Sequence, residues 1–197
     1  MQILVVDFYD SFVYNLVHYI KSLNCRVKVL QDEDINPNEL KFLEDFDGIF
    51  LSPGPGLPQE TRSMLPIIAY SKGKIPIFGV CLGMQGLGLD LGGSLKNLNA
   101  IAHGSSVNLN QLKQGRILQS LPDTFAVGLY HSWVVDCLSD EYIFAKDERG
   151  IVMAIECNSN LQFGVQFHPE SILTENGMQI VRNVLSVFLL VSKKNKL

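Results

Sequence analysis

A cysteine flanked by glycines is the side chain in this sequence best suited to act as a nucleophile. Cys81 follows the apolar run at residues 75–80, and Gly79 and Gly83 lie two positions to either side of it. This pattern predicts a buried strand, a sharp turn at the cysteine and a helix over residues 82–91. At a helix N-terminus the thiolate, which is the reactive form, is stabilised by free N–H groups and by the helix dipole. The same pattern also fits a small buried cysteine with glycines for close packing.

A histidine far downstream supplies a base for that nucleophile. Residues 161–167 alternate with apolar side chains at the odd positions, which predicts a half-buried strand, and the run ends in His168-Pro169-Glu170. A lone histidine is more often structural than catalytic. A cysteine on a sharp turn together with a strand-end His-x-Glu is more specific, because nucleophile, base and orienting carboxylate are all present.

Several motifs together resemble the class I (triad-type) glutamine amidotransferases. They are Gly-Val-Cys-Leu-Gly-Met-Gln at 79–85, Ser-Pro-Gly-Pro-Gly-Leu-Pro at 52–58 and Gln-Phe-His-Pro-Glu at 166–170. The opening at residues 6–16 and Tyr-His-Ser at 130–132 resemble one branch of the family. That branch comprises the glutaminase subunits of anthranilate synthase and of para-aminobenzoate (aminodeoxychorismate) synthase.

The resemblance implies a set of site residues. Cys81, His168 and Glu170 would be the catalytic triad for hydrolysis of L-glutamine. The loop Gly54-Pro55-Gly56 would form the oxyanion hole, with the N–H groups of Gly56 and Leu82 as donors. The side chain of Gln85 and the segment Ser132-Trp133 would bind the substrate glutamine. His131 could serve as a second base, but we expect a structural role because His168 already has a carboxylate partner.

The resemblance also implies a partner and no cofactor or metal. In the family, ammonia passes to a chorismate-binding synthase subunit (component I), which makes anthranilate or 4-amino-4-deoxychorismate. We find no chorismate or Mg²⁺ site in the sequence, so either would belong to the partner. Two alternatives remain: a stand-alone γ-glutamyl hydrolase or peptidase on the same fold, and a catalytically inactive subunit that only binds a partner. Gln85 and Tyr-His-Ser argue against the first, and an intact Cys, His and Glu against the second.

The sequence departs from the family pattern at four positions. Phe8 stands where Asn is usual, Ser105 where Lys is usual, Leu129 where Arg is frequent, and Trp133 where Leu is usual. None of these is a proposed triad residue. We expect them to affect loop packing or coupling to a partner.

Composition predicts a single globular domain over residues 1–197. The chain is 47% hydrophobic, enough for a sizeable core, and its net charge of −4 argues against nucleic acid or an anionic membrane as a partner. No apolar run is long enough to span a bilayer and no leader peptide is evident. The four cysteines show no paired or metal-like spacing, so we expect free thiols and a cytoplasmic protein.

The order of patterns predicts an α/β fold. Strands and helices alternate over residues 2–93, which indicates an open, mostly parallel sheet with helices on both faces, a flavodoxin-like three-layer arrangement. We expect a short helix starting at Asn36-Pro37 and another over residues 60–71. Short apolar runs between 94 and 160, including residues 105–109, 117–118 and 132–137, predict a smaller antiparallel region beside the main sheet. An apolar helix over 176–190 closes the chain.

Overall fold

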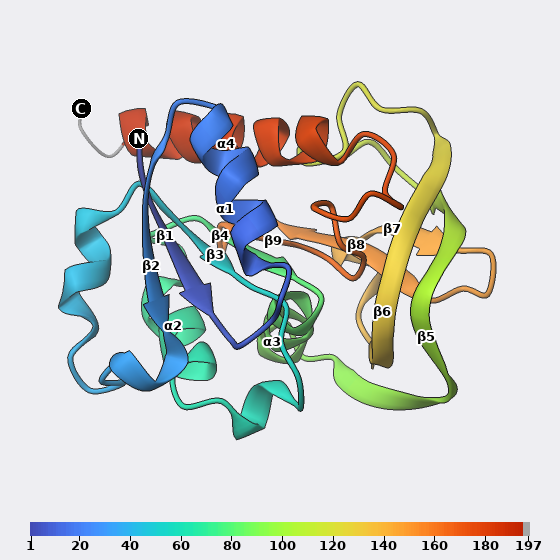
Figure 1. Cartoon of the computed structure of the whole chain (residues 1–197), viewed down its shortest axis with the longest axis horizontal. Coiled ribbons are helices and arrows are strands. Elements are labelled where there is room, and N and C mark those ends of the chain that lie inside the picture. The colour runs from blue at the N-terminus through green and yellow to red at the C-terminus, as the bar shows by residue number, and fades with distance from the viewer. Residues whose placement is uncertain (195–197) are drawn as a thin grey trace.

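One nine-stranded sheet runs through the molecule (Figure 1). The computed structural model describes residues 1–194, without side-chain detail at 99–103 and 194. In spatial order the sheet reads β2-β1-β3-β4-β9-β8-β7-β5-β6. The strands are β1 (Gln2–Asp7), β2 (Arg26–Gln31), β3 (Gly48–Leu51), β4 (Ile77–Val80), β5 (Ser94–Gln111), β6 (Thr124–Asp136), β7 (Ile143–Asp147), β8 (Val152–Cys157) and β9 (Gln162–Val165).

The parallel half of the sheet is covered on both faces, which confirms the predicted three-layer α/β class. Strands β2, β1, β3, β4 and β9 pair in parallel. One face packs against α1 (Val13–Ser22) and α4 (Gly177–Lys194), in the core that holds Val5, Phe50 and Phe78. The other face packs against α2 (Met64–Ser71) and α3 (Leu82–Asp90). Because both faces are buried, β3, β4 and β9 are buried along their whole length.

The antiparallel strands extend this same sheet. Strand β8 pairs with β9, β7 with β8, and β5 with both β7 and β6. The predicted runs at 105–109 and 132–137 are parts of the long strands β5 and β6, which form a hairpin at the edge. The run at 117–118 is not a strand. It belongs to a buried turn that Glu156 holds by accepting the backbone N–H groups of Arg116 and Ile117 at 3.0 Å each.

Two predicted helix starts are wrong. The helix expected from residue 60 begins at Met64, after a 3₁₀ turn over Pro58–Glu60. Buried Asp32 accepts the backbone N–H groups of Arg62 and Ser63 at 2.8 Å, so a tertiary contact fixes the chain just before the helix. The segment after Asn36-Pro37 becomes helical only at Leu40–Asp45, where it forms a 3₁₀ helix. Among the described residues, no helix is both long and apolar enough to cross a membrane.

Glycines allow α3 to pack directly on the sheet just after β4. A Cβ at Gly79 would lie 2.5 Å from the backbone O of Gly83 and 2.5 Å from the backbone N of Met84. A Cβ at Gly83 would lie 2.5 Å from the backbone O of Leu51. These contacts are with backbone atoms that cannot rotate away, so only glycine permits this approach. The turn that carries Cys81 is therefore held between two close backbone contacts.

We predict that Gly79→Ala destabilises the fold by about 3 kcal/mol or more, because the added methyl group overpacks a rigid backbone contact. Urea unfolding measures the loss. Gly150→Ala is the control, since Gly150 has φ +80° but no atom within 4 Å of an added Cβ. That control should lose only about 1–2 kcal/mol from backbone strain. Equal losses in the two variants would show that the contact at Gly79 relaxes and does not constrain the turn.

Candidate active site

Cys81 has a strained backbone conformation at the turn between β4 and α3. Its φ and ψ are 52° and −102°, and it occupies the N-cap position of α3. A non-glycine residue in such a conformation costs about 1–3 kcal/mol and persists only where surrounding contacts impose it. Two of those contacts are hydrogen bonds: the Cys81 N–H donates to the Val165 carbonyl at 2.8 Å, and the Cys81 carbonyl accepts the Gln85 N–H at 3.0 Å. The side chain is thereby fixed at the helix N-terminus.

His168 and Glu170 form a buried pair beyond the end of β9. The two residues are 1% and 3% exposed, and Nδ1 of His168 lies 2.8 Å from Oε1 of Glu170. The His168 backbone is also held: its N–H donates to the Gly128 carbonyl at 3.1 Å, and its carbonyl accepts the Thr174 hydroxyl at 2.6 Å. The ring of Tyr130 packs edge-on against the imidazole, with centroids 4.9 Å apart. The imidazole is thus restricted in both position and rotation.

The charge of His168 depends on its two neighbours. Burial lowers the pKa of His168, but the adjacent Cys81 and the hydrogen bond to Glu170 raise it, so that the pKa reaches about 10. The ring is therefore protonated at neutral pH beside the Cys81 sulfur. No hydrogen bond of acceptable geometry joins Nε2 of His168 to any described residue, Cys81 included. Cys81 is nonetheless close enough to the ring to raise the pKa of His168.

A cavity of about 190 Å³ opens onto Cys81. This volume is below the roughly 300–1,000 Å³ typical of sites for drug-sized ligands, and it suits a molecule the size of an amino acid. The structure brings together here all seven residues predicted to bind substrate or oxyanion, although they come from three separate stretches of chain. The lining comprises Gly54, Pro55, Gly56, Cys81, Leu82, Gln85, Tyr130, His131, Ser132 and Trp133.

The cavity wall presents both predicted groups of polar contacts. Leu82 is the first residue of α3, where a backbone N–H has no partner within the helix, and Gly56, with φ +77°, lines the same cavity. Across the cavity, the Gln85 amide donates to the Trp133 carbonyl at 2.8 Å. This bond joins α3 to β6, so the antiparallel edge of the sheet supplies one wall of the cavity.

Comparison with known proteins decides the family. A model described as glutamine amidotransferase class-I matches residues 4–187. The chain belongs to the class-I glutamine amidotransferases. It is 38% identical over 191 residues to anthranilate synthase component 2 of Mycobacterium tuberculosis, covering 94% of this chain and 82% of that one.

One further relative and one solved structure are also similar to this chain. A bifunctional protein TrpGD of Thermotoga maritima is 35% identical over 191 residues, and the match covers 94% of this chain but only 32% of that protein. A crystal structure described as a GMP synthase component from Thermoplasma acidophilum has a TM-score of 0.87 at 23% identity, covering 100% of this chain and 98% of that one. The sequence resemblance and the fold class are both confirmed.

The positions that depart from the family pattern differ in their surroundings. Phe8 is buried, and a Cβ at Gly54 would lie 2.7 Å from the Phe8 Cβ, so Phe8 packs under the amidotransferase loop 54–56. Leu129 is fully buried in the core, and Ser105 is exposed. Trp133 contributes the backbone carbonyl that holds Gln85. Two of the four departures therefore contact the cavity walls.

Sequence reasoning missed Gln166 as a site residue. Its amide Nε2 lies 3.5 Å from the Cys81 sulfur, and the side chain is fully buried. The available clue was its position two residues before His168, because side chains two apart on an extended chain lie on the same side. Tyr130 and Phe12 were also missed as the aromatic rings that pack against His168.

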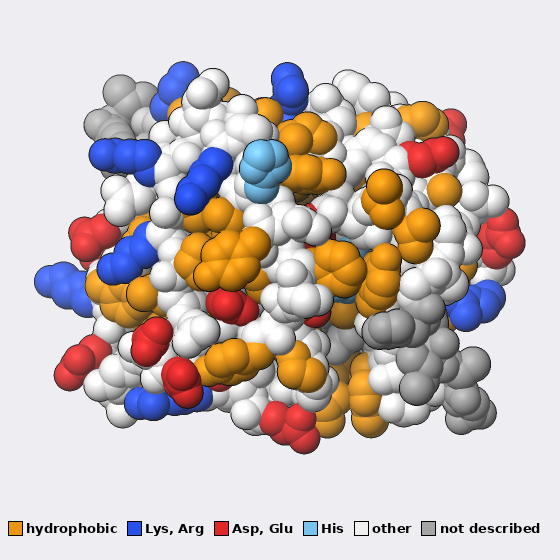
Figure 2. Space-filling model, in the orientation of Figure 1, with side chains coloured by type: hydrophobic (Ala, Val, Ile, Leu, Met, Phe, Trp, Pro, Cys, Tyr) orange, Lys and Arg blue, Asp and Glu red, His pale blue; other side chains and the backbone are white. Residues whose placement is uncertain are grey.

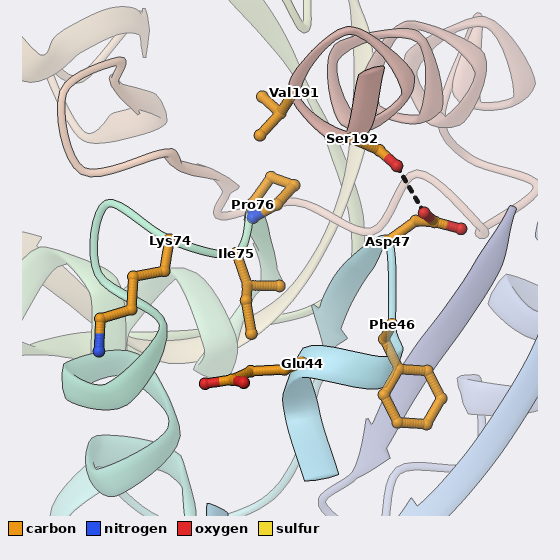
Figure 3. Close-up of a pocket in the computed structure, with 8 residues that line it drawn as sticks. All are labelled: Glu44, Phe46, Asp47, Lys74, Ile75, Pro76, Val191 and Ser192. Atoms are coloured by element: carbon orange, nitrogen blue, oxygen red, sulfur yellow. Dashed lines mark hydrogen bonds between the residues drawn. The ribbon is translucent and has the colours of Figure 1, made fainter. Parts of the chain in front are cut away.

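Figure 3 shows a larger cavity, of about 310 Å³. It lies where the chain enters β4, and Cys81 follows the other end of that strand. Ile75 and Pro76 enter it just before β4, and Ser192 of α4 donates to Asp47 at 2.6 Å on its border. No cysteine or histidine is among the described residues that line it. Within the part of the chain that the structure describes, no cluster of three or more His, Cys, Asp or Glu side chains could hold a metal ion.

His131 is a second buried histidine beside the cavity, and unlike His168 it is uncharged at neutral pH. Its side chain is 5% exposed, and neither ring nitrogen has a hydrogen-bond partner among the described residues. Burial, together with the nearby His168 and Arg149, lowers the pKa of His131 to about 4. The imidazole is therefore neutral at pH 7.

We predict that His131 makes the fold sensitive to acid. Its folded pKa of about 4 lies below the ordinary value of 6.5, so its stabilising effect is complete above pH 6.5 and declines as the pH falls toward 4. By pH 5 the native protein should lose about 2 kcal/mol that a His131→Phe variant keeps. Urea unfolding of both proteins at pH 7, 6 and 5 measures the difference. Parallel losses in the two would rule out a buried neutral imidazole at this position.

Proposed function

We propose that this chain is a glutaminase subunit that hydrolyses L-glutamine through Cys81, His168 and Glu170 and passes ammonia to a synthase partner. The observation that carries the proposal is a strained Cys81, which lines a cavity the size of one amino acid, beside a buried, protonated His168. Membership of the glutamine amidotransferase family supports the same substrate.

The first half of the reaction forms a thioester. The Cys81 thiolate attacks the side-chain carboxamide carbon of glutamine, and the N–H groups of Gly56 and Leu82 stabilise the negative oxygen that develops. Such donors typically lower the barrier by about 2.7–4 kcal/mol each. The protonated Nε2 of His168 then gives its proton to the leaving nitrogen, the C–N bond breaks, and ammonia departs. Glu170 holds the ring so that Nε2 faces the reacting atoms.

The second half regenerates the enzyme. His168, now neutral, takes a proton from a water molecule, which attacks the glutamyl thioester. The C–S bond breaks, glutamate leaves, and the thiolate and imidazolium are restored. Gln85, Ser132 and Trp133, which line the same cavity as Cys81, would hold the α-amino and α-carboxylate groups of the substrate.

The partner we propose is a chorismate-binding synthase subunit. Relatives named as anthranilate synthase component 2 support this choice. The cavity at Cys81 has room for about one amino acid, so we propose that chorismate binds to the partner. Figure 2 shows hydrophobic side chains over the centre of the face on which α1 lies, and Tyr9, Tyr14 and Ile172 are among the exposed large apolar residues of the chain. We propose that the partner covers the rim of the cavity, including the loop at 52–58 and the turn at 10–12.

We predict that Cys81→Ser lowers glutamine-dependent synthesis by the assembled complex about 10⁴-fold or more, because a hydroxyl cannot replace the thiolate nucleophile. Synthesis from added ammonium salt should stay nearly unchanged. The assay follows chorismate amination with anthranilate synthase component I and, separately, with the chorismate-binding component of aminodeoxychorismate synthase.

The same assay separates the alternatives. Hydrolysis of γ-glutamyl peptides at a rate that is unchanged by either synthase partner would favour a stand-alone hydrolase. Absence of glutamine turnover by the native chain with both partners would favour a non-catalytic subunit. Either result would overturn the proposed function.

We predict unequal losses at the two other triad positions. His168→Ala should lose about as much kcat for glutamine as the Cys81 variant, since nucleophile and base act as a unit. Glu170→Ala should lose roughly 10–100-fold less, because its carboxylate orients the ring and transfers no proton. Circular dichroism confirms that each variant is folded. A folded Glu170→Ala protein as inactive as His168→Ala would mean that Glu170 does more than orient the ring.

A further inference from the structure

Gln166 contacts the proposed nucleophile, and the mechanism above gives it no role. Its side chain is fully buried, and its Nε2 donates toward the Cys81 sulfur at 3.5 Å. Its Oε1 accepts from Nε2 of Gln85 at 3.5 Å. Gln85 in turn donates to the Trp133 carbonyl at 2.8 Å. A chain of hydrogen bonds therefore runs from β6 through α3 to the sulfur.

The direction of this chain is set at its far end. A backbone carbonyl can only accept hydrogen bonds, so Trp133 obliges Gln85 to present its NH₂ group. That same NH₂ group also donates to Gln166, so the acceptor on Gln166 is its side-chain carbonyl oxygen. The remaining end of the Gln166 amide is its NH₂ group, and it points at the sulfur. The group that faces the sulfur is therefore a hydrogen-bond donor. A thiolate accepts such a hydrogen bond strongly, whereas a thiol accepts it only weakly.

We propose that Gln166 is a positioning residue for the nucleophile, which holds the Cys81 sulfur as a thiolate through an amide N–H whose orientation is fixed by Gln85 and the Trp133 carbonyl. This inference rests on the proposed role of Cys81 as the nucleophile. It adds a residue that acts through the sulfur and touches no substrate.

The hydrogen bond between Gln166 and Cys81 also bears on the role of Nε2 of His168. In this structure the sulfur has a hydrogen bond with Gln166, whereas Nε2 of His168 has none with any described residue. The amide holds the sulfur, and the protonated ring next to it stays available for the leaving nitrogen. Because Gln85 also lines the cavity, a substrate that contacts Gln85 touches the residue that orients Gln166.

The test is the pH dependence of Cys81 alkylation by iodoacetamide, which needs neither glutamine nor a partner. Peptide mass spectrometry must quantify Cys81 separately, because Cys137 is exposed and will also react. In Gln166→Met, which keeps a similar volume but lacks the donor, the midpoint of the profile should move up by about one pH unit. The kcat for glutamine should fall about tenfold with little change in KM.

Gln162→Met is the matched control. Gln162 is equally buried and belongs to β9, but its amide donates to Asp90 at 2.8 Å and not to the sulfur. Its alkylation profile should match that of the native protein. If Gln166→Met fails to fold, Gln166→Leu decides, because leucine also lacks the donor and adds no charge, so the midpoint should move in the same direction.

An unchanged midpoint in a folded Gln166 variant, or an equal shift in Gln162→Met, would overturn the inference. The outcome is independent of the proposed function. A shifted alkylation profile in a protein that turns over no glutamine would retain the role of Gln166 and reject glutamine hydrolysis.

Discussion

The close contact between β4 and α3 is the constraint on which the rest of the site depends. Gly79 and Gly83 allow the two backbones to meet with no side chain between them. Where the backbones of β4 and α3 meet this closely, Cys81 is the residue that connects them, and it adopts a strained conformation. The strain is maintained by the sheet on one side and by the helix on the other. Its thiol therefore projects from the carboxyl edge of the parallel strands, where open α/β sheets bind their ligands.

The antiparallel extension of the sheet supplies what the parallel half lacks. Because β8 pairs with β9 and the β5–β6 hairpin continues the same sheet, β6 is held beside the cavity. From there Trp133 fixes Gln85, Gly128 fixes the backbone of His168, and Tyr130 packs against the imidazole. Because β6 belongs to the same sheet as β4 and β9, the backbone hydrogen bonds of the sheet help to fix these groups relative to Cys81.

Features that depend on local sequence pattern could be predicted from the sequence. Features that depend on contacts between residues distant in the chain could not. The turn at Cys81 and the presence of a strand before His168 follow from glycine spacing and alternation over a few residues, and both are confirmed. The half-buried character predicted for that strand is wrong, because β9 is covered on both faces and buried along its whole length. The start of α2 at Met64 depends on Asp32, about thirty residues away in the chain, so local pattern placed it too early. The length of β5 and β6 depends on their mutual pairing. The contact between Gln166 and Cys81 joins residues whose proximity follows only from the pairing of β4 with β9.

The two buried histidines show why position alone does not define a catalytic group. Burial lowers the pKa of both, and they lie near enough to influence each other. His168 has a carboxylate at 2.8 Å and the Cys81 sulfur beside it, so its pKa reaches about 10 and it can deliver a proton at neutral pH. His131 has no such partner among the described residues, so its pKa falls to about 4. A neutral His131 adds no second positive charge next to the first. The protonated state of His168 thus depends on its own partners, and its charge in turn helps to keep His131 neutral.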